Sequence, residues 1–301
     1  MYLGRGSRPA APRQHPSAAR GSLPILRCFS LQSHIVTQEE QKVILFLSGL
    51  PLWASVLLLV VLPTIVGMCG PVLMRRLIGF ERLASNNEIA GFKFATVGVI
   101  YAVILAFAVI VVWEKFSEAE TAVIQEAGAV ATIYRLVDGP QPEATATQVA
   151  LGNYLRLVID RDWPMMSEGK RSRDVTQALD ALYMRAIQMT ENLSRDRAIF
   201  YEIFKQLDTI TQARRTRLYL STGVVPPTIW LVLFSGAALT VGFTFFFSTE
   251  NLPAQVIMTG VLSVIVFLGL LVIVSIDHPF TGPVHVGSEP LQSVIEDFGH
   301  G

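Results

Sequence analysis

Long uninterrupted runs of uncharged, mostly apolar residues dominate the hydrophobic pattern of this chain. Four such runs, of 20 to 32 residues, are each bracketed by charged residues: Lys42 to Arg75, Lys93 to Glu114, Arg217 to Glu250, and Glu250 to Asp277. About 20 apolar residues cross the hydrocarbon core of a bilayer as a helix, and backbone amides in lipid need partners within their own segment. We therefore predict four transmembrane helices, near residues 44–68, 94–113, 227–247 and 255–276.

The polar region between the second and third runs carries apolar residues spaced three or four apart, which is typical of helices. Two stripes have this spacing: Phe116, Ala119, Val123, Ala127, Val130, Tyr134 and Val137, and then Val175, Leu179, Leu182, Ala186, Met189 and Leu193. Turn residues at 138–140 and Trp163-Pro164 are expected to end helices, and Ser172 and Ser194 stand at N-cap positions. We predict four helices whose stripes, Phe116 and Met189 included, pack inside a bundle and do not line a ligand site.

The second run continues into the first stripe without a helix breaker. Only Gly98 and Gly128 interrupt the good helix formers between Lys93 and Val137, and single glycines are tolerated in helices. At 1.5 Å per residue this segment predicts one rigid rod of roughly 65 Å.

These patterns predict an all-α fold: a polytopic membrane protein with four transmembrane helices and a helical soluble domain inserted between the second and third. The predicted divisions are a disordered basic tail (1–40), a first transmembrane pair (41–113), the helical soluble domain (114–217), a second transmembrane pair (218–276) and a C-terminal tail (277–301).

Composition agrees with a membrane protein and excludes several functions. The chain is 51% hydrophobic and only 16% charged, and its 24 basic and 24 acidic residues cancel, so no basic surface indicates nucleic acid as a partner. Cys28, Cys69 and five scattered histidines show no metal-ligand spacing. We expect no cofactor, no metal and no enzymatic activity, since no nucleophile–base pair or phosphate loop is visible.

The first 38 residues contain five arginines and no acidic residue, a composition that predicts disorder. Two interpretations stay open for this segment. It resembles an Arg-rich transit peptide, or it reflects a start codon assigned too far upstream of a protein that begins near Val36.

A polar triplet, Asn86-Asn87-Glu88, stands just before the second span. Asn and acidic residues cap helix N-termini and favour the helix dipole. The same cluster at the mouth of a span is also a candidate ion filter or ligand site, with Glu88 as its carboxylate.

Three segments carry a resemblance to a known family. They are "NNEIAGFKFATVGVIYAVILAFAVIVVWEKFSEAE" (86–120), "YRL" (134–136) and "DHPFTGPVHVGSEP" (277–290). Over about residues 70–295 the chain resembles bacterial membrane proteins described as bestrophin-like. More distantly, it is similar to true bestrophins, in which a mid-span phenylalanine is followed about nine residues later by an Arg-Trp pair. Here Phe107 is followed by Lys115 and Phe116.

Bestrophins are pentameric ion channels whose second span lines a narrow apolar neck. The resemblance therefore implies a homo-oligomer in a lipid bilayer, a pentamer if bestrophin-like, with neck residues Val99, Val103 and Phe107 on one helix face. Two of these are smaller than the usual neck residues, and "AVIVV" (108–112) replaces polar residues that follow the neck in bacterial bestrophins. The alternative for these three side chains is packing against lipid or another span.

The distribution of basic residues gives a weak preference for sidedness. Six Lys and Arg flank the spans on the side of the helical domain, against four on the other side, which favours a cytoplasmic helical domain in a bacterial inner membrane. The opposite orientation would fit a membrane sensor or signalling scaffold without conduction. The sequence does not identify an ion.

Overall fold

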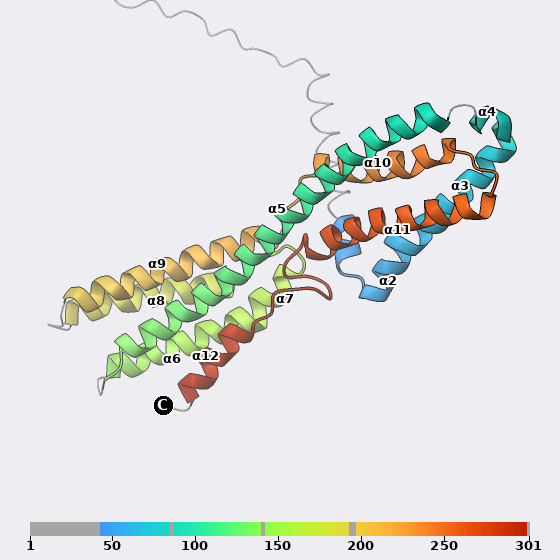
Figure 1. Ribbon diagram of the computed structural model, residues 1–301. Coiled ribbons are helices and arrows are strands. Elements are labelled where there is room, and N and C mark those ends of the chain that lie inside the picture. Colours follow the sequence, from blue (N-terminus) through green and yellow to red (C-terminus); the bar gives the residue numbers. More distant parts are fainter. Residues whose placement is uncertain (1–42, 85–86, 140–141, 193–196, 300–301) are drawn as a thin grey trace, which may run out of the picture. The chain divides into compact units, whose positions relative to one another are not determined.

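The computed structural model describes residues 43–84, 87–139, 142–192 and 197–299, all within the unit Glu40–Gly301 (Figure 1). Within these ranges the secondary structure is entirely helical. Residues 1–42, which include the predicted basic tail and Cys28, lie outside the described part of the chain. The all-α prediction is confirmed.

Four of the described helices are long and apolar enough to cross a membrane. The first joins α2 (Leu52–Val56), a π-helical turn (Leu57–Val61) and α3 (Leu62–Ile78), and the second is α5 (Asn87–Leu136). The third is α10 (Pro227–Phe243) with a 3₁₀ turn (Thr244–Phe246), and the fourth is α11 (Leu252–Ile276). A short helix, α4 (Phe80–Ala84), connects the first two.

The first span differs from its predicted position at 44–68. The helical stretch 43–48 ends before Gly49, and the spanning helix begins only after Pro51 and continues to Ile78. Pro51 has no N–H to donate and fixes an extended entry at φ −60° and ψ 145°. Arg75, which bounds the uncharged run, and Arg76 lie in the last turn of this helix, where basic side chains favour the helix dipole.

Helix α5 is a single helix of 50 residues, about 75 Å long at 1.5 Å per residue. The predicted continuity from the second span into the first stripe is therefore confirmed. The helix packs against α10 and α11 in the membrane part and against α9 (Arg197–Leu220) and α12 (Glu289–Gly299) beyond it (Figure 1).

The other helices of the polar region are α6 (Pro142–Leu157), α7 (Trp163–Met166) and α8 (Arg173–Asn192). Together with α9, α12 and the C-terminal half of α5 they form what we call the bundle. The predicted helix end at Trp163-Pro164 falls slightly early, because a π-helical turn (Val158–Asp162) carries α6 directly into α7, which ends at Met166. Pro164, the second residue of α7, follows this π-helical turn, and it has no N–H for an intrahelical hydrogen bond.

Most residues of both predicted stripes are buried in the core of the bundle, and Phe116 and Tyr134 pack against it partly buried. Val123, Val130 and Val175 are fully buried, and Met189 packs in the same cluster, as predicted. Ser172 directly precedes α8 as expected, whereas Leu193 and Ser194 lie outside the described residues.

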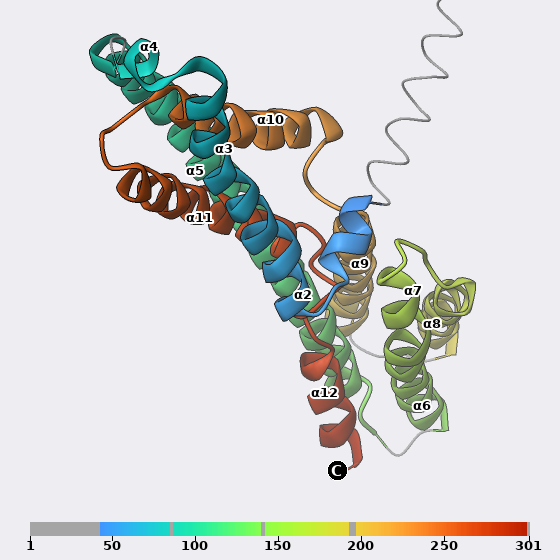
Figure 2. The same cartoon turned by 90° about the vertical axis from the view of Figure 1, so that its right-hand side faces the viewer.

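Helix α12 was not predicted, because its residues had been assigned to a C-terminal tail. It lies beside α5 (Figure 2) and buries Leu291 and Val294 in the bundle core. The Phe298 ring stacks on Tyr134 with centroids 3.7 Å apart. The segment after the last span is thus part of the bundle.

Candidate pore face and its buried support

The predicted neck residues lie on an exposed face of α5. Val99 and Phe107 are each 64% exposed in the single chain, and Val103 is 49% exposed. Spacings of four residues place the three side chains on one side of the helix. Exposed apolar side chains of this size need lipid or another protein chain beside them.

The opposite face of α5 is held tightly by the other spans. The Tyr101 hydroxyl is buried and donates a hydrogen bond to the Leu233 carbonyl of α10 at 3.1 Å. A Cβ on Gly269 of α11 would lie 2.6 Å from Leu105 Cδ2, so the missing side chain leaves room for Leu105 in its present position. The rotation of α5 within the chain is therefore fixed, with Val99, Val103 and Phe107 facing outward.

Asn87 and Glu88, of the polar triplet at the mouth of the span, differ in their surroundings. Asn87 bonds both backbone groups of Ser248: its Nδ2 donates to the carbonyl at 2.5 Å, and its Oδ1 accepts from the amide at 3.0 Å. Asn87 thus anchors the connection between α10 and α11 to the start of α5. Glu88 is exposed on the first turn of α5, and Asn86 lies outside the described residues.

At the predicted span exit, Lys115 and Phe116 point to different surroundings. Lys115 forms an ion pair with Glu118 at 2.7 Å, with both side chains about half-exposed. The half-buried Phe116 stacks beside Trp113 and packs against both hydrophobic cores, that of the membrane helices and that of the bundle. Phe116 is therefore one contact through which the two cores meet.

A buried ionic cluster in the bundle was missed by sequence reasoning. Arg217 of α9 binds Glu126 of α5 with two hydrogen bonds, from Nε at 2.9 Å and from Nη2 at 3.1 Å. Arg214 binds Asp162 in the same way, at 2.8 and 3.3 Å, and Arg217 Nη2 lies 3.5 Å from the same carboxylate. All four groups are buried. Two acids and two bases compensate each other there, as buried charges require.

The electrostatics of this cluster favour its paired state. Burial is the largest single influence on Arg217 and lowers its pKa, but Glu126, Tyr154 and Asp162 together raise it by more, so the pKa is raised overall. Burial and the neighbouring Glu126 hold the pKa of Tyr154 well above its usual value, so the phenol stays protonated and donates to Glu126 at 2.7 Å. The sequence signal was a charged residue on an apolar stripe: Arg217 falls between the buried Ile210 and Leu220.

The "DHPF" segment after α11 makes polar contacts where the membrane helices meet the bundle. Asp277 accepts hydrogen bonds from the amides of Val224 and Val225 at 3.2 and 2.8 Å. His278 Nδ1 lies 3.0 Å from Asp277 Oδ2 and 3.4 Å from Ser48 Oγ. A catalytic triad needs the acid and the serine on different ring nitrogens. Both meet Nδ1 here, so this group does not have the geometry of a triad.

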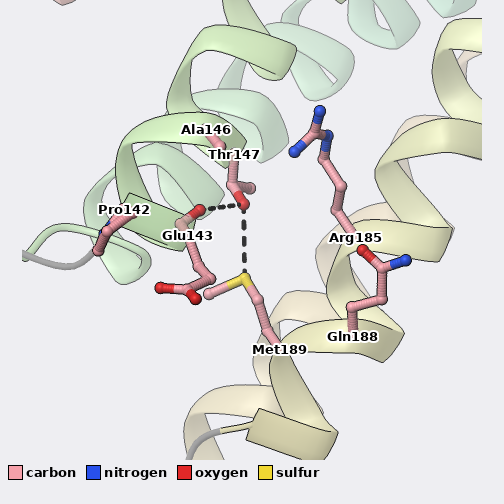
Figure 3. A pocket seen from close by; sticks show the side chains of 7 residues that line it. All are labelled: Pro142, Glu143, Ala146, Thr147, Arg185, Gln188 and Met189. Carbon is pink, nitrogen blue, oxygen red and sulfur yellow. Dashed lines mark hydrogen bonds between the residues drawn. The ribbon is translucent and has the colours of Figure 1, made fainter.

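A pocket of about 250 Å³ opens between α6 and α8, at the edge of the described residues. Figure 3 shows Met189 reaching from α8 toward Thr147 on α6, with its sulfur 3.5 Å from the hydroxyl. Glu143 and Arg185 bring charges of both signs to this pocket. In the described part of the chain, no three His, Cys, Asp or Glu residues gather as metal ligands.

Comparisons with known proteins show which family this chain resembles. The family model of the bestrophin-like domain matches residues 61–291. No curated protein sequence shows a significant match.

Crystal structures of point variants of a bacterial bestrophin homologue from Klebsiella pneumoniae superpose with TM-scores of 0.64, 0.61 and 0.60, at 13%, 14% and 15% identity. The matches cover 80% of this chain and 96 to 97% of those chains. At this identity the likeness concerns the fold. With the family model matching most of its length, the chain belongs to the bestrophin-like family of membrane proteins.

Proposed function

We propose that this protein is a homo-oligomeric ion channel whose pore is lined by α5, with Val99, Val103 and Phe107 as its apolar neck. The observation that carries the proposal is the exposed face of α5. This helix is held by α10 and α11 on one side, yet it presents uncharged, apolar side chains on the other from Val99 to Trp113. Hydrophobic constrictions can gate pores by dewetting.

Identical copies are the expected neighbours of this face. Four spans are too few to enclose a pore within one chain, and a ring of copies would place each α5 face against the same face of its neighbours. Kinship with bestrophins favours a pentamer. The neck would then be a ring of Phe107 side chains, and the surrounding lipid would contact the outer spans.

The remaining assignments complete this proposal. Residues 41–113 and 218–276 form the transmembrane pairs, and 114–217 forms the soluble domain, to which α12 adds a helix from the segment 277–301. The domain faces the cytoplasm of a bacterial cell, with the spans in the inner membrane. Asn87 and Glu88 stand at the outer mouth, and Lys115 and Phe116 at the inner exit.

The continuous α5 rod supports a second candidate, a membrane sensor without conduction. Phe116 touches both cores, so a change in one part is transmitted to the other. Orientation separates the two functions, because the channel requires the exposed Lys170 loop inside the cell. Lys170→Cys in a Cys28→Ser, Cys69→Ser background is expected to resist an impermeant thiol reagent in intact cells. Labelling there would favour the sensor.

Ion flux into liposomes tests the channel directly. Phe107→Ala removes the bulkiest neck side chain and is expected to raise flux above that of the parent protein, because a wider neck stays wetted. Val109→Ala, on the half-buried side of the same helix, is the matched control and should leave flux near the parent level. Oligomer size is measured first for each variant. If the parent protein and Phe107→Ala both fold and form oligomers but show no ion flux, the proposal is contradicted.

A further inference from the structure

A basic hollow of about 600 Å³ lies on the bundle between the α7–α8 loop and α9. Lys170 and Arg171 line it from the loop, and Arg215 lines it from α9, all three with exposed side chains. Its lining contains no acidic residue. Glu168 lies nearby and pairs with Lys170 at 2.6 Å, so the two arginines carry the uncompensated charge.

The loop geometry sets the backbone positions of Lys170 and Arg171 beside this hollow. Gly169 has φ +68°, a left-handed conformation that reverses the chain after α7. The amides of Gly169 and Lys170 donate to the carbonyls of Met166 and Met165 at 2.9 and 2.8 Å. Lys170 and Arg171 are thus presented by a hydrogen-bonded turn.

Two observations place the hollow beside the membrane-spanning helices. Thr222, part of its lining, stands five residues before α10 begins at Pro227. Thr281, five residues after the end of α11, donates a hydrogen bond at 3.3 Å to the carbonyl of Ser167, where the α7–α8 loop starts. The hollow therefore lies close to where two membrane helices emerge from the bilayer.

The remaining lining suits the lipid headgroup region. Tyr219 is 75% exposed, and the half-buried Leu218 and Met165 line the hollow with it. Exposed aromatic side chains near span ends typically sit at the membrane interface. An apolar floor with a cationic rim fits the glycerol backbone and phosphate of a phospholipid. Arginine is the preferred partner, because its guanidinium binds phosphate with two hydrogen bonds.

We infer that this hollow binds the phosphate of an anionic phospholipid headgroup, held by Arg171 and Arg215 with Lys170 at the rim. Basic pockets beside membrane helices recognise anionic headgroups in this way. The inference does not depend on conduction, since it concerns only the bundle and its distance from the bilayer. Binding at this hollow makes the position of the α7–α8 loop depend on the charge of the surrounding lipid.

The test uses the full chain, purified in a neutral detergent, and native mass spectrometry to count bound lipids per protomer. Phosphatidylglycerol is titrated in mixed micelles, with phosphatidylcholine of the same acyl chains as the neutral comparison and inorganic phosphate as the free anion. Phosphatidylglycerol should bind saturably, and more tightly than phosphatidylcholine. Arg171→Gln and Arg215→Gln should each weaken it about fivefold, and together about 25-fold, as the typical contribution of one interfacial basic residue implies.

Lys205→Gln is the matched control, because Lys205 is exposed on the same helix ten residues away from Arg215. It should leave phosphatidylglycerol binding unchanged, and Arg215→Lys should lose less affinity than Arg215→Gln. Equal phosphatidylglycerol binding by the parent and the folded double variant would overturn the inference. So would equal binding of phosphatidylcholine, or arginine-dependent binding of inorganic phosphate without that of the lipid, which would indicate a soluble ligand instead.

Discussion

The two halves of α5 form one continuous helix but differ in the polarity of their outward faces. In the bundle half the inward face is apolar and buried, as at Val123 and Val130, while the outward face carries exposed polar residues such as Thr121 and Gln125. In the membrane half the outward face is as apolar as the inward one. The bundle half is complete within one chain, whereas the membrane half requires lipid or another copy beside it.

The interactions that hold α5 in place also differ between its two halves. The bundle half contains a buried charged residue, Glu126, whose partner Arg217 comes from α9. The membrane half contains no charge between Lys93 and Glu114, and it is oriented by close packing at glycines and by one hydroxyl, that of Tyr101. Substitutions in the two halves should therefore have effects of different size.

The largest effect is expected at the buried ion pair. Arg217→Ala leaves Glu126 and Asp162 without their shared partner, which should destabilise the protein by about 3–5 kcal/mol. Denaturant titration in a neutral detergent, followed by circular dichroism, measures this. Arg215→Ala, the exposed neighbour on α9, should cost about 0.5 kcal/mol or less. Equal costs at the two positions would show that the cluster does not stabilise the bundle.

A somewhat smaller effect is expected where α12 completes the bundle. Leu291 is fully buried, so Leu291→Ala should cost about 2–4 kcal/mol by leaving a cavity. Gln292→Ala, at the exposed neighbouring position, is the control. A thermal denaturation midpoint that is the same for both variants would mean that α12 detaches readily and that the bundle is complete without it.

In the membrane half the corresponding change should be milder. Tyr101→Phe removes one hydrogen bond to a carbonyl and keeps the ring in place, so about 1 kcal/mol is expected. Thermal denaturation in detergent, compared with Leu291→Ala, measures it. A larger loss from Tyr101→Phe than from Leu291→Ala would reverse the comparison between the two halves.

The smallest effect is expected at the surface ion pair of the span exit. Lys115 and Glu118 are each about half-exposed, and such pairs typically contribute a few tenths of a kcal/mol. Lys115→Gln should leave the denaturation midpoint nearly unchanged in moderate salt. A shift comparable to that of Tyr101→Phe would indicate that Lys115 has a further contact at the exit, for example with a neighbouring copy.

The predictable parts of the fold follow from strong local signals. Charges bracket the spans, and apolar stripes mark the bundle helices, so the helical architecture and the unbroken α5 could be read from the sequence. The first span was misplaced because an uncharged run does not reveal where inside it a helix begins. Pro51 decides this, because the spanning helix begins directly after it. Helix α12 is short, and its burial depends on tertiary contacts with α5 and α6.

The site was predicted less completely than the fold. Local spacing places Val99, Val103 and Phe107 on one face, but only the packing of Tyr101 and Gly269 shows that this face points away from the chain. Glu126 and Arg217 are 91 positions apart, so their pairing is invisible to any local pattern. The basic hollow likewise combines Arg171 and Arg215 from separate elements.

The central claim is that the exposed face of α5 meets the same face of identical copies around a pore. Disulfide crosslinking in membranes tests it most directly, in a Cys28→Ser, Cys69→Ser background. Phe107→Cys should form covalent dimers on mild oxidation, whereas Val109→Cys, half-buried against the protomer's own helices, should stay monomeric. Monomers alone from Phe107→Cys, or equal crosslinking at both positions, would contradict the account.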